Sequence, residues 1–129
     1  MPRNERGAAA VEFALVLPLL VLLFAGIAEM GRIYYLQATL SGAAREGARV
    51  MALQNNVAAT VTAVKSAAGS VALTDAQIAV TPATGACRSA TTAPVQASVT
   101  ITFTMPLVST VFGTTPVKIR GSGVMQCGG

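Results

Sequence analysis

The sequence predicts an α+β protein: one long N-terminal helix crosses a membrane and extends into a small head, where a short helix packs on a three-stranded antiparallel sheet. An uneven distribution of apolar residues, which gather in residues 7 to 36, predicts the membrane segment. Helical spacing continues to Leu53, and strict alternation over residues 95 to 105 predicts a strand. The 129 residues suffice for one small domain and a membrane segment.

The membrane segment is the first predicted element. Residues 13 to 28 are 16 consecutive uncharged residues, and Glu12 is the single charge among the 22 residues from Gly7 to Ala28. About 20 residues span a bilayer, so we expect the crossing at about residues 8 to 30. Arg3 and Arg6 precede it, and basic residues favour the cytoplasmic side. The N-terminus is therefore expected inside and residues 54 to 129 outside.

Two other interpretations of this segment remain open. A secretory signal would have the same basic start and apolar run, with Gly26 and Ala28 placed for cleavage after Ala28. The helical pattern passes Ala28 without a break, which favours retention of the helix. A plain uncleaved anchor is the third interpretation.

The helix is expected to run from about Ala8 to Leu53, roughly 70 Å at 1.5 Å per residue. Pro18 removes one helix hydrogen bond and predicts a kink or local unwinding near residues 14 to 18. Beyond the bilayer, small and aliphatic residues recur at helical spacing on one face. They are Ile33, Leu36, Leu40, Ala44 and Ala48. On the exposed side, Arg45, Glu46 and Arg49 form either a solvated helix face or a contact between subunits.

The head begins after the polar stop at residues 54 to 56. Apolar residues at helical spacing predict a short helix from Val57 that ends at Gly69. A short strand at residues 76 to 81 and a Thr-, Ser- and Ala-rich loop at 82 to 94 follow. Residues 95 to 105 alternate without exception, and a third strand is expected over 117 to 127 with Lys118, Arg120 and Ser122 outward.

The two cysteines, Cys87 and Cys127, predict a disulfide because so small a head needs a cross-link and export places it in an oxidising compartment. Two cysteines without other soft ligands do not make a zinc site, so no metal or cofactor is expected. The chain has no histidine, which excludes hydrolase triads that need one, and we expect no enzymatic activity.

The run Arg6-Gly7-Ala8-Ala9-Ala10-Val11-Glu12-Phe13 resembles the processing site of type IV pilins, most closely that of the TadE-like pseudopilins of the Tad (tight adherence) pilus. A second resemblance to this family lies in the stretch from Ala43 to Arg49, preceded by residues 37 to 40. The resemblance implies a leader of residues 1 to 7, removed by a prepilin peptidase after Gly7. Ala8 would then be the first residue of the mature chain and Glu12 the fifth.

The resemblance also implies a function in pilus assembly at the cytoplasmic (inner) membrane, with incorporation into an extracellular pilus possible. The implied partners are a prepilin peptidase, other pilins or pseudopilins, a platform protein in the membrane, and lipid. Glu12 would neutralise the α-ammonium of Ala8 on its own or a neighbouring subunit.

Two alternative functions compete with pilus assembly. The first is a signal-anchored or secreted module that binds a surface along the exposed face from Gln96 to Thr104. The second is a DNA-uptake pseudopilin with a basic patch of Arg88, Lys118 and Arg120. The net charge of +4 is small and the chain has few aromatic residues, so the composition argues against nucleic-acid binding.

Overall fold

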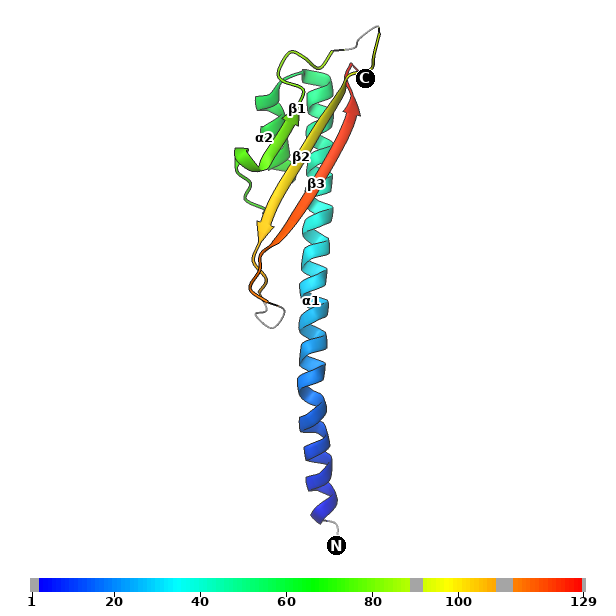
Figure 1. Cartoon of the computed structure of the whole chain (residues 1–129), viewed down its shortest axis with the longest axis vertical. Coiled ribbons are helices and arrows are strands. Elements are labelled where there is room, and N and C mark those ends of the chain that lie inside the picture. The colour runs from blue at the N-terminus through cyan, green and yellow to red at the C-terminus, as the bar shows by residue number, and fades with distance from the viewer. Residues whose placement is uncertain (1–2, 89–91, 109–112, 129) are drawn as a thin grey trace.

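The computed structural model describes residues 3–88, 92–108 and 113–128, and it confirms the α+β class. Figure 1 shows one helix far longer than the head that it carries. The elements in chain order are α1 (Arg3–Gln54), α2 (Val57–Ala67), the 3-10 turn η1 (Asp75–Gln77), β1 (Ile78–Thr81), β2 (Gln96–Met105) and β3 (Val117–Gln126).

Helix α1 is a single element of 52 residues. It begins at Arg3, so it includes residues that the sequence assigns to the leader, and it ends within one residue of the predicted Leu53. The helix continues through Pro18 without interruption, so the local unwinding expected at residues 14 to 18 is wrong, while the alternative of a kink stays a prediction. Proline removes only one backbone donor, and the hydrogen bonds of the turns on either side maintain the helix.

Two asparagines make the turn between α1 and α2. Asn55 adopts a left-handed conformation with φ of 52°, which asparagine tolerates better than most residues, and so ends α1. Its Oδ1 accepts hydrogen bonds from the backbone N–H groups of Gly85 (3.0 Å) and Cys87 (2.9 Å). Asn56 is the N-cap of α2, since its side chain accepts from the backbone N–H of Ala59 at 3.1 Å. The polar segment that ends α1 therefore also binds, through the Asn55 side chain, the backbone of the loop that carries Cys87.

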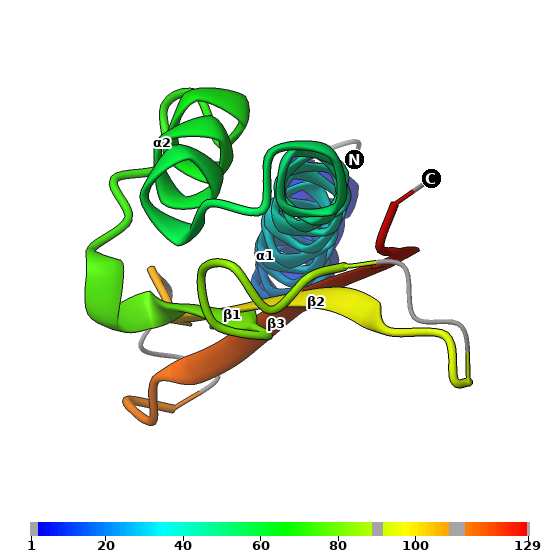
Figure 2. The same ribbon diagram turned by 90° about the horizontal axis from the view of Figure 1, so that it is seen from above.

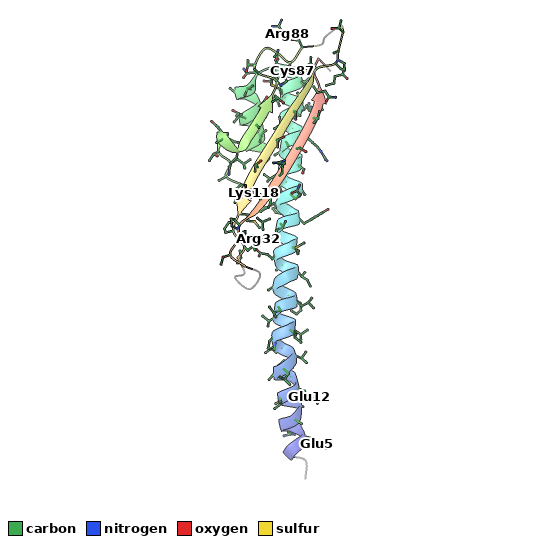
Figure 3. The ribbon with its side chains drawn as sticks, viewed as in Figure 1. Glu5, Glu12, Arg32, Cys87, Arg88 and Lys118 are labelled. Atoms are coloured by element: carbon green, nitrogen blue, oxygen red, sulfur yellow. A yellow bond between two sulfur atoms is a disulfide. The ribbon has the colours of Figure 1, made fainter. Side chains whose placement is uncertain are left out.

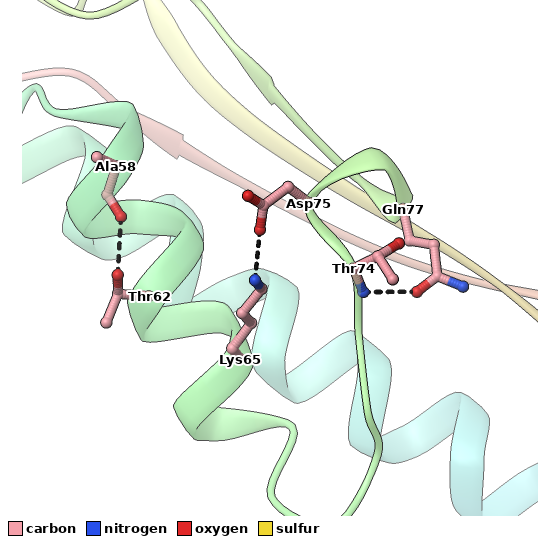
Figure 4. Close-up of polar contacts among 6 residues, drawn as sticks. All are labelled: Ala58, Thr62, Lys65, Thr74, Asp75 and Gln77. Carbon is pink, nitrogen blue, oxygen red and sulfur yellow. Dashed lines mark hydrogen bonds and ion pairs between the residues drawn. The ribbon is translucent and has the colours of Figure 1, made fainter.

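The three strands form one antiparallel sheet in the order β1-β2-β3. Strand β1 begins at Ile78 rather than at residue 76, because the preceding residues form η1, where the backbone N–H of Thr74 donates to Gln77 Oε1 at 2.8 Å (Figure 4). Strand β2 pairs along its whole length with β3, from Gln96 opposite Gln126 to Met105 opposite Val117. An ion pair between Lys65 and Asp75 joins α2 to η1 (Figure 4).

Both helices cover the same face of the sheet, as Figure 2 shows from above. The predicted alternation of β2 is confirmed, because its apolar residues face the helices and its Thr and Ser residues face away. The core joins the inner faces of β1, β2 and β3 to small and aliphatic residues of α1 and α2. Its buried members include Leu40, Ala43, Ala44, Ala48, Val64, Ile78, Val99, Ile101, Met105 and Ile119.

Two glycines allow β3 to lie directly against α1. A Cβ atom on Gly121 would lie 2.5 Å from the backbone carbonyl carbon of Leu40, and one on Gly123 would lie 2.5 Å from the carbonyl carbon and oxygen of Ala44. Real Cβ atoms do not approach backbone so closely, so any other residue would push the strand away from the helix. Glycine at these two positions sets the spacing between helix and sheet.

The predicted disulfide is confirmed between Cys87 and Cys127, which are separated by 40 residues in the chain. It lies at the end of the head remote from the apolar part of α1 (Figure 3), in a second buried cluster with Met51, Ala52 and Ala97. The bond therefore links the long loop before β2 to the end of β3, and it packs against the last turns of α1.

We predict that Gly123→Ala lowers the free energy of unfolding by about 1 to 3 kcal/mol, because the new methyl group forces β3 away from the backbone of Ala44. The measurement is denaturant unfolding of the full chain in detergent micelles, followed by circular dichroism. Ser122→Ala on the exposed neighbour is the matched control, with an expected change within about 0.5 kcal/mol. Equal effects of the two substitutions would contradict the close approach.

We predict that the double substitution of Cys87 and Cys127 by serine lowers the free energy of unfolding by about 4 kcal/mol, since it opens a ring of 40 residues. The same unfolding measurement checks this value. In the unsubstituted protein, denatured without reductant, both thiols should resist alkylation. Labelling of both cysteines under those conditions would contradict the disulfide.

Candidate functional site

The N-terminal half of α1 exposes a continuous apolar surface. Every described side chain from Glu5 to Phe24 is exposed, and the large apolar ones include Val11, Phe13, Leu15, Leu19, Leu23 and Phe24. An 18-residue window of this helix has a mean hydropathy of 2.5, and none of that window is buried. Soluble monomers rarely expose apolar surface of this extent. A single-pass membrane anchor agrees with this length and composition.

The predicted processing and assembly residues lie on the first turns of this surface. Gly7, Ala8, Glu12 and Phe13 are all helical and exposed. A Cβ atom on Gly7 would meet nothing within 4 Å, so the fold gives no packing reason for glycine there. Glu12 forms no ion pair with any described residue (Figure 3). Ala8 and Glu12 are four residues apart and therefore share one face of the helix.

The charged residues of the second sequence motif lie on the side of α1 away from the core, whereas its alanines, Ala44 and Ala48 among them, are buried in the core. Arg49 Nη1 lies 3.1 Å from Glu46 Oε1, and the two side chains are 58% and 44% exposed. Such an i,i+3 pair stabilises a helix by only a few tenths of a kcal/mol. Arg45 is exposed and outside this pair. The three residues leave a charged surface on α1 that the head does not cover.

Glu29 is a functional candidate that the sequence analysis missed. It is only 7% exposed, and its Oε1 accepts a hydrogen bond from the backbone N–H of Val108 at 2.9 Å. Arg32 Nη1 lies 3.9 Å from its Oε2. The sequence feature that could have indicated Glu29 is its position, directly after the uncharged run and three residues before Arg32. Its partner is a backbone group 79 residues later, which no spacing in the sequence indicates.

The base of the head contains a cavity of about 360 Å³ next to this contact. Its walls come from three parts of the chain: α1, the turn after α2, and the end of β2. The lining residues are Arg32, Tyr35, Leu36, Ser70, Val71, Ala72, Phe103, Met105 and Pro106. The cavity is mostly apolar, and Arg32 supplies a positive charge.

The predicted residues do not converge on one site. Arg88 lies beside the disulfide, whereas Lys118 lies toward the opposite end of the head (Figure 3). Cys127 comes nine positions after Lys118, about 30 Å in an extended strand. The single basic patch predicted for Arg88, Lys118 and Arg120 is therefore wrong. Among the described residues, no three acidic, histidine or cysteine side chains gather where they could hold a metal ion.

The protein is of the helix-and-head class: a long apolar N-terminal helix, compatible with single-pass membrane anchoring, carries a small disulfide-linked α+β head. The model of the TadE-like protein family matches residues 7–49, which lie within α1. The match supports the resemblance to TadE-like proteins over this segment. No curated protein and no solved structure matches the chain.

Proposed function

We propose that this chain is a minor pilin or pseudopilin of a Tad-type pilus, processed by a prepilin peptidase after Gly7 and assembled through α1. The observation that carries the proposal is the TadE-like match over residues 7–49, which covers an exposed apolar helix with one carboxylate near its start. Its partners are the peptidase, other pilins or pseudopilins, and a platform protein of the inner membrane.

Glu12 is the residue that gives this assembly its register. Cleavage after Gly7 creates an ammonium group on Ala8, one helical turn from the Glu12 carboxylate. In the low dielectric of a bilayer or of packed helices, each charge is costly unless it is paired. A subunit in the correct axial position places its Ala8 ammonium beside a Glu12 carboxylate, on its own or a neighbouring helix. Assembly then pairs both charges and lowers the free-energy cost of burying them.

Other features of α1 support contacts between subunits. Gly31 and Gly42 are exposed, and a Cβ atom on either would meet nothing within 4 Å. Glycine inside a helix costs about 1 kcal/mol relative to alanine, and the fold does not use the space at these two positions. Small residues let neighbouring helices approach closely. The charged surface of Arg45, Glu46 and Arg49 offers polar contacts farther along the same helix.

We predict that the protein recovered from its native membrane begins at Ala8. N-terminal sequencing and the intact mass check this, because the three interpretations of the N-terminal segment give three different first residues. Glu29 as the first residue would indicate a released secreted domain. An intact Met1 would indicate a plain anchor or an unprocessed precursor. Either result would contradict prepilin processing.

We predict that Glu12→Gln leaves membrane insertion intact but reduces incorporation into pili by an order of magnitude or more, since the Ala8 ammonium loses its counter-charge. The measurement compares the amount of this protein in sheared pili with the amount in the membrane fraction. Asp75→Asn, which removes an exposed carboxylate from the head, is the control and should incorporate normally. Normal incorporation of the Glu12 variant would contradict the proposed role.

A further inference from the structure

We propose that the base of the head is a lipid-docking surface: the segment Pro106–Val108, pinned to α1 by Glu29, lies in the headgroup layer of the outer leaflet. The protein would then contact the bilayer at two places, the α1 span and this segment. The inference rests on the membrane crossing of α1 in the proposed function, but not on incorporation into a pilus.

The first argument is the position of Glu29 along the helix. Glu29 directly follows Ala28, the last residue of the uncharged run. Its Oε1 accepts the hydrogen bond of the Val108 backbone N–H at 2.9 Å. A helical residue rises only 1.5 Å, so Val108 lies within a few ångströms of the level at which the span ends. Figure 1 shows the described residues that follow β2 and precede β3, 106–108 and 113–116, beyond the end of the sheet on the side of the apolar half of α1.

The second argument is the chemistry of the segment. Val108 is 72% exposed although it is apolar, and Pro106 beside it is also exposed. The whole connection from residue 106 to residue 116 contains no charged residue. Tyr34 and Tyr35, one to two turns after Glu29, are exposed as well. Exposed aliphatic and tyrosine side chains at one level of a membrane protein are typical of the interface.

The third argument is the charge of this end of the head. Arg32 and Lys118 both lie toward the base in Figure 3, and both are exposed. The acid at this level, Glu29, is 7% exposed and already accepts from Val108. The surface that faces the bilayer is therefore positive and complements the phosphates of acidic phospholipids. The cavity of about 360 Å³ beside Arg32 and Pro106 gives a lipid headgroup room next to the guanidinium.

The test places an environment-sensitive fluorophore at Val108 in the full chain. The native cysteines form a disulfide, so a cysteine introduced by Val108→Cys is the reactive thiol. The labelled protein is reconstituted in vesicles of phosphatidylcholine and phosphatidylglycerol. We expect strong quenching by lipids with a headgroup spin label, and quenching by aqueous iodide several-fold weaker than at a water-exposed position.

Two matched positions calibrate the measurement. Val124→Cys replaces another exposed valine, on the outward face of β3, and should be fully accessible to iodide. Leu20→Cys lies inside the apolar run and should be fully shielded. If Leu20 is shielded but Val108 behaves like Val124, the docking surface is overturned and the membrane crossing stands. If iodide reaches Leu20, the crossing itself is overturned, and the docking surface with it.

A second variant tests the anchoring role of Glu29. In the Glu29→Ala background the backbone N–H of Val108 loses its acceptor, so we expect the fluorophore at position 108 to become several-fold more accessible to iodide. Glu46→Ala, which removes a carboxylate far from the base, is the control. Shielding that does not change in the Glu29 variant would overturn the part of the proposal that assigns the anchor to Glu29.

Discussion

The backbone of β3 lies against the backbone of α1 at Gly121 and Gly123, and the arrangement of the head depends on this contact. A side chain at either glycine would meet the carbonyl groups of Leu40 or Ala44. Since β3 rests on the helix over these positions, β2 is brought over the buried small residues of α1 and can place Val99 and Ile101 in the core. The same contact fixes the height of the sheet along the helix, and hence the level at which the connection after β2 meets Glu29.

Helix α1 is continuous, although its two halves have different surroundings. Its first half exposes apolar side chains on all sides, as a lipid-embedded helix does, whereas its second half buries one stripe against the sheet and exposes charges on the other side. No linker divides the two halves, because the helix is one element of 52 residues. The head and the membrane segment are therefore mechanically coupled, and any rotation of the span also turns the head. For a protein that assembles through its helix, this coupling sets the orientation of each head.

Much of this fold follows from periodicity in the sequence. Alternation in β2, helical spacing in α2 and the isolated cysteine pair predicted these features correctly, because each signal is local or involves a unique pair. The contacts that the sequence did not reveal are those between distant backbone groups. Gly121 and Gly123 resemble ordinary flexible residues until the helix beside them is known, and Asn55 resembles a polar stop although its side chain binds the loop around Cys87. The predicted unwinding at Pro18 gave too much weight to one missing hydrogen bond.

Two carboxylates lie near the two ends of the apolar run, and the fold treats them differently. Glu12 and Glu29 are 17 residues apart, about 25 Å along a helix, which is close to the thickness of the hydrocarbon layer. Glu29 is buried by its own chain and accepts the hydrogen bond of Val108. Glu12 is exposed and has no ion-pair partner within the described residues. Because an unpaired carboxylate in lipid is costly, folding gives Glu29 its partner, and under the proposed function processing and assembly give Glu12 one.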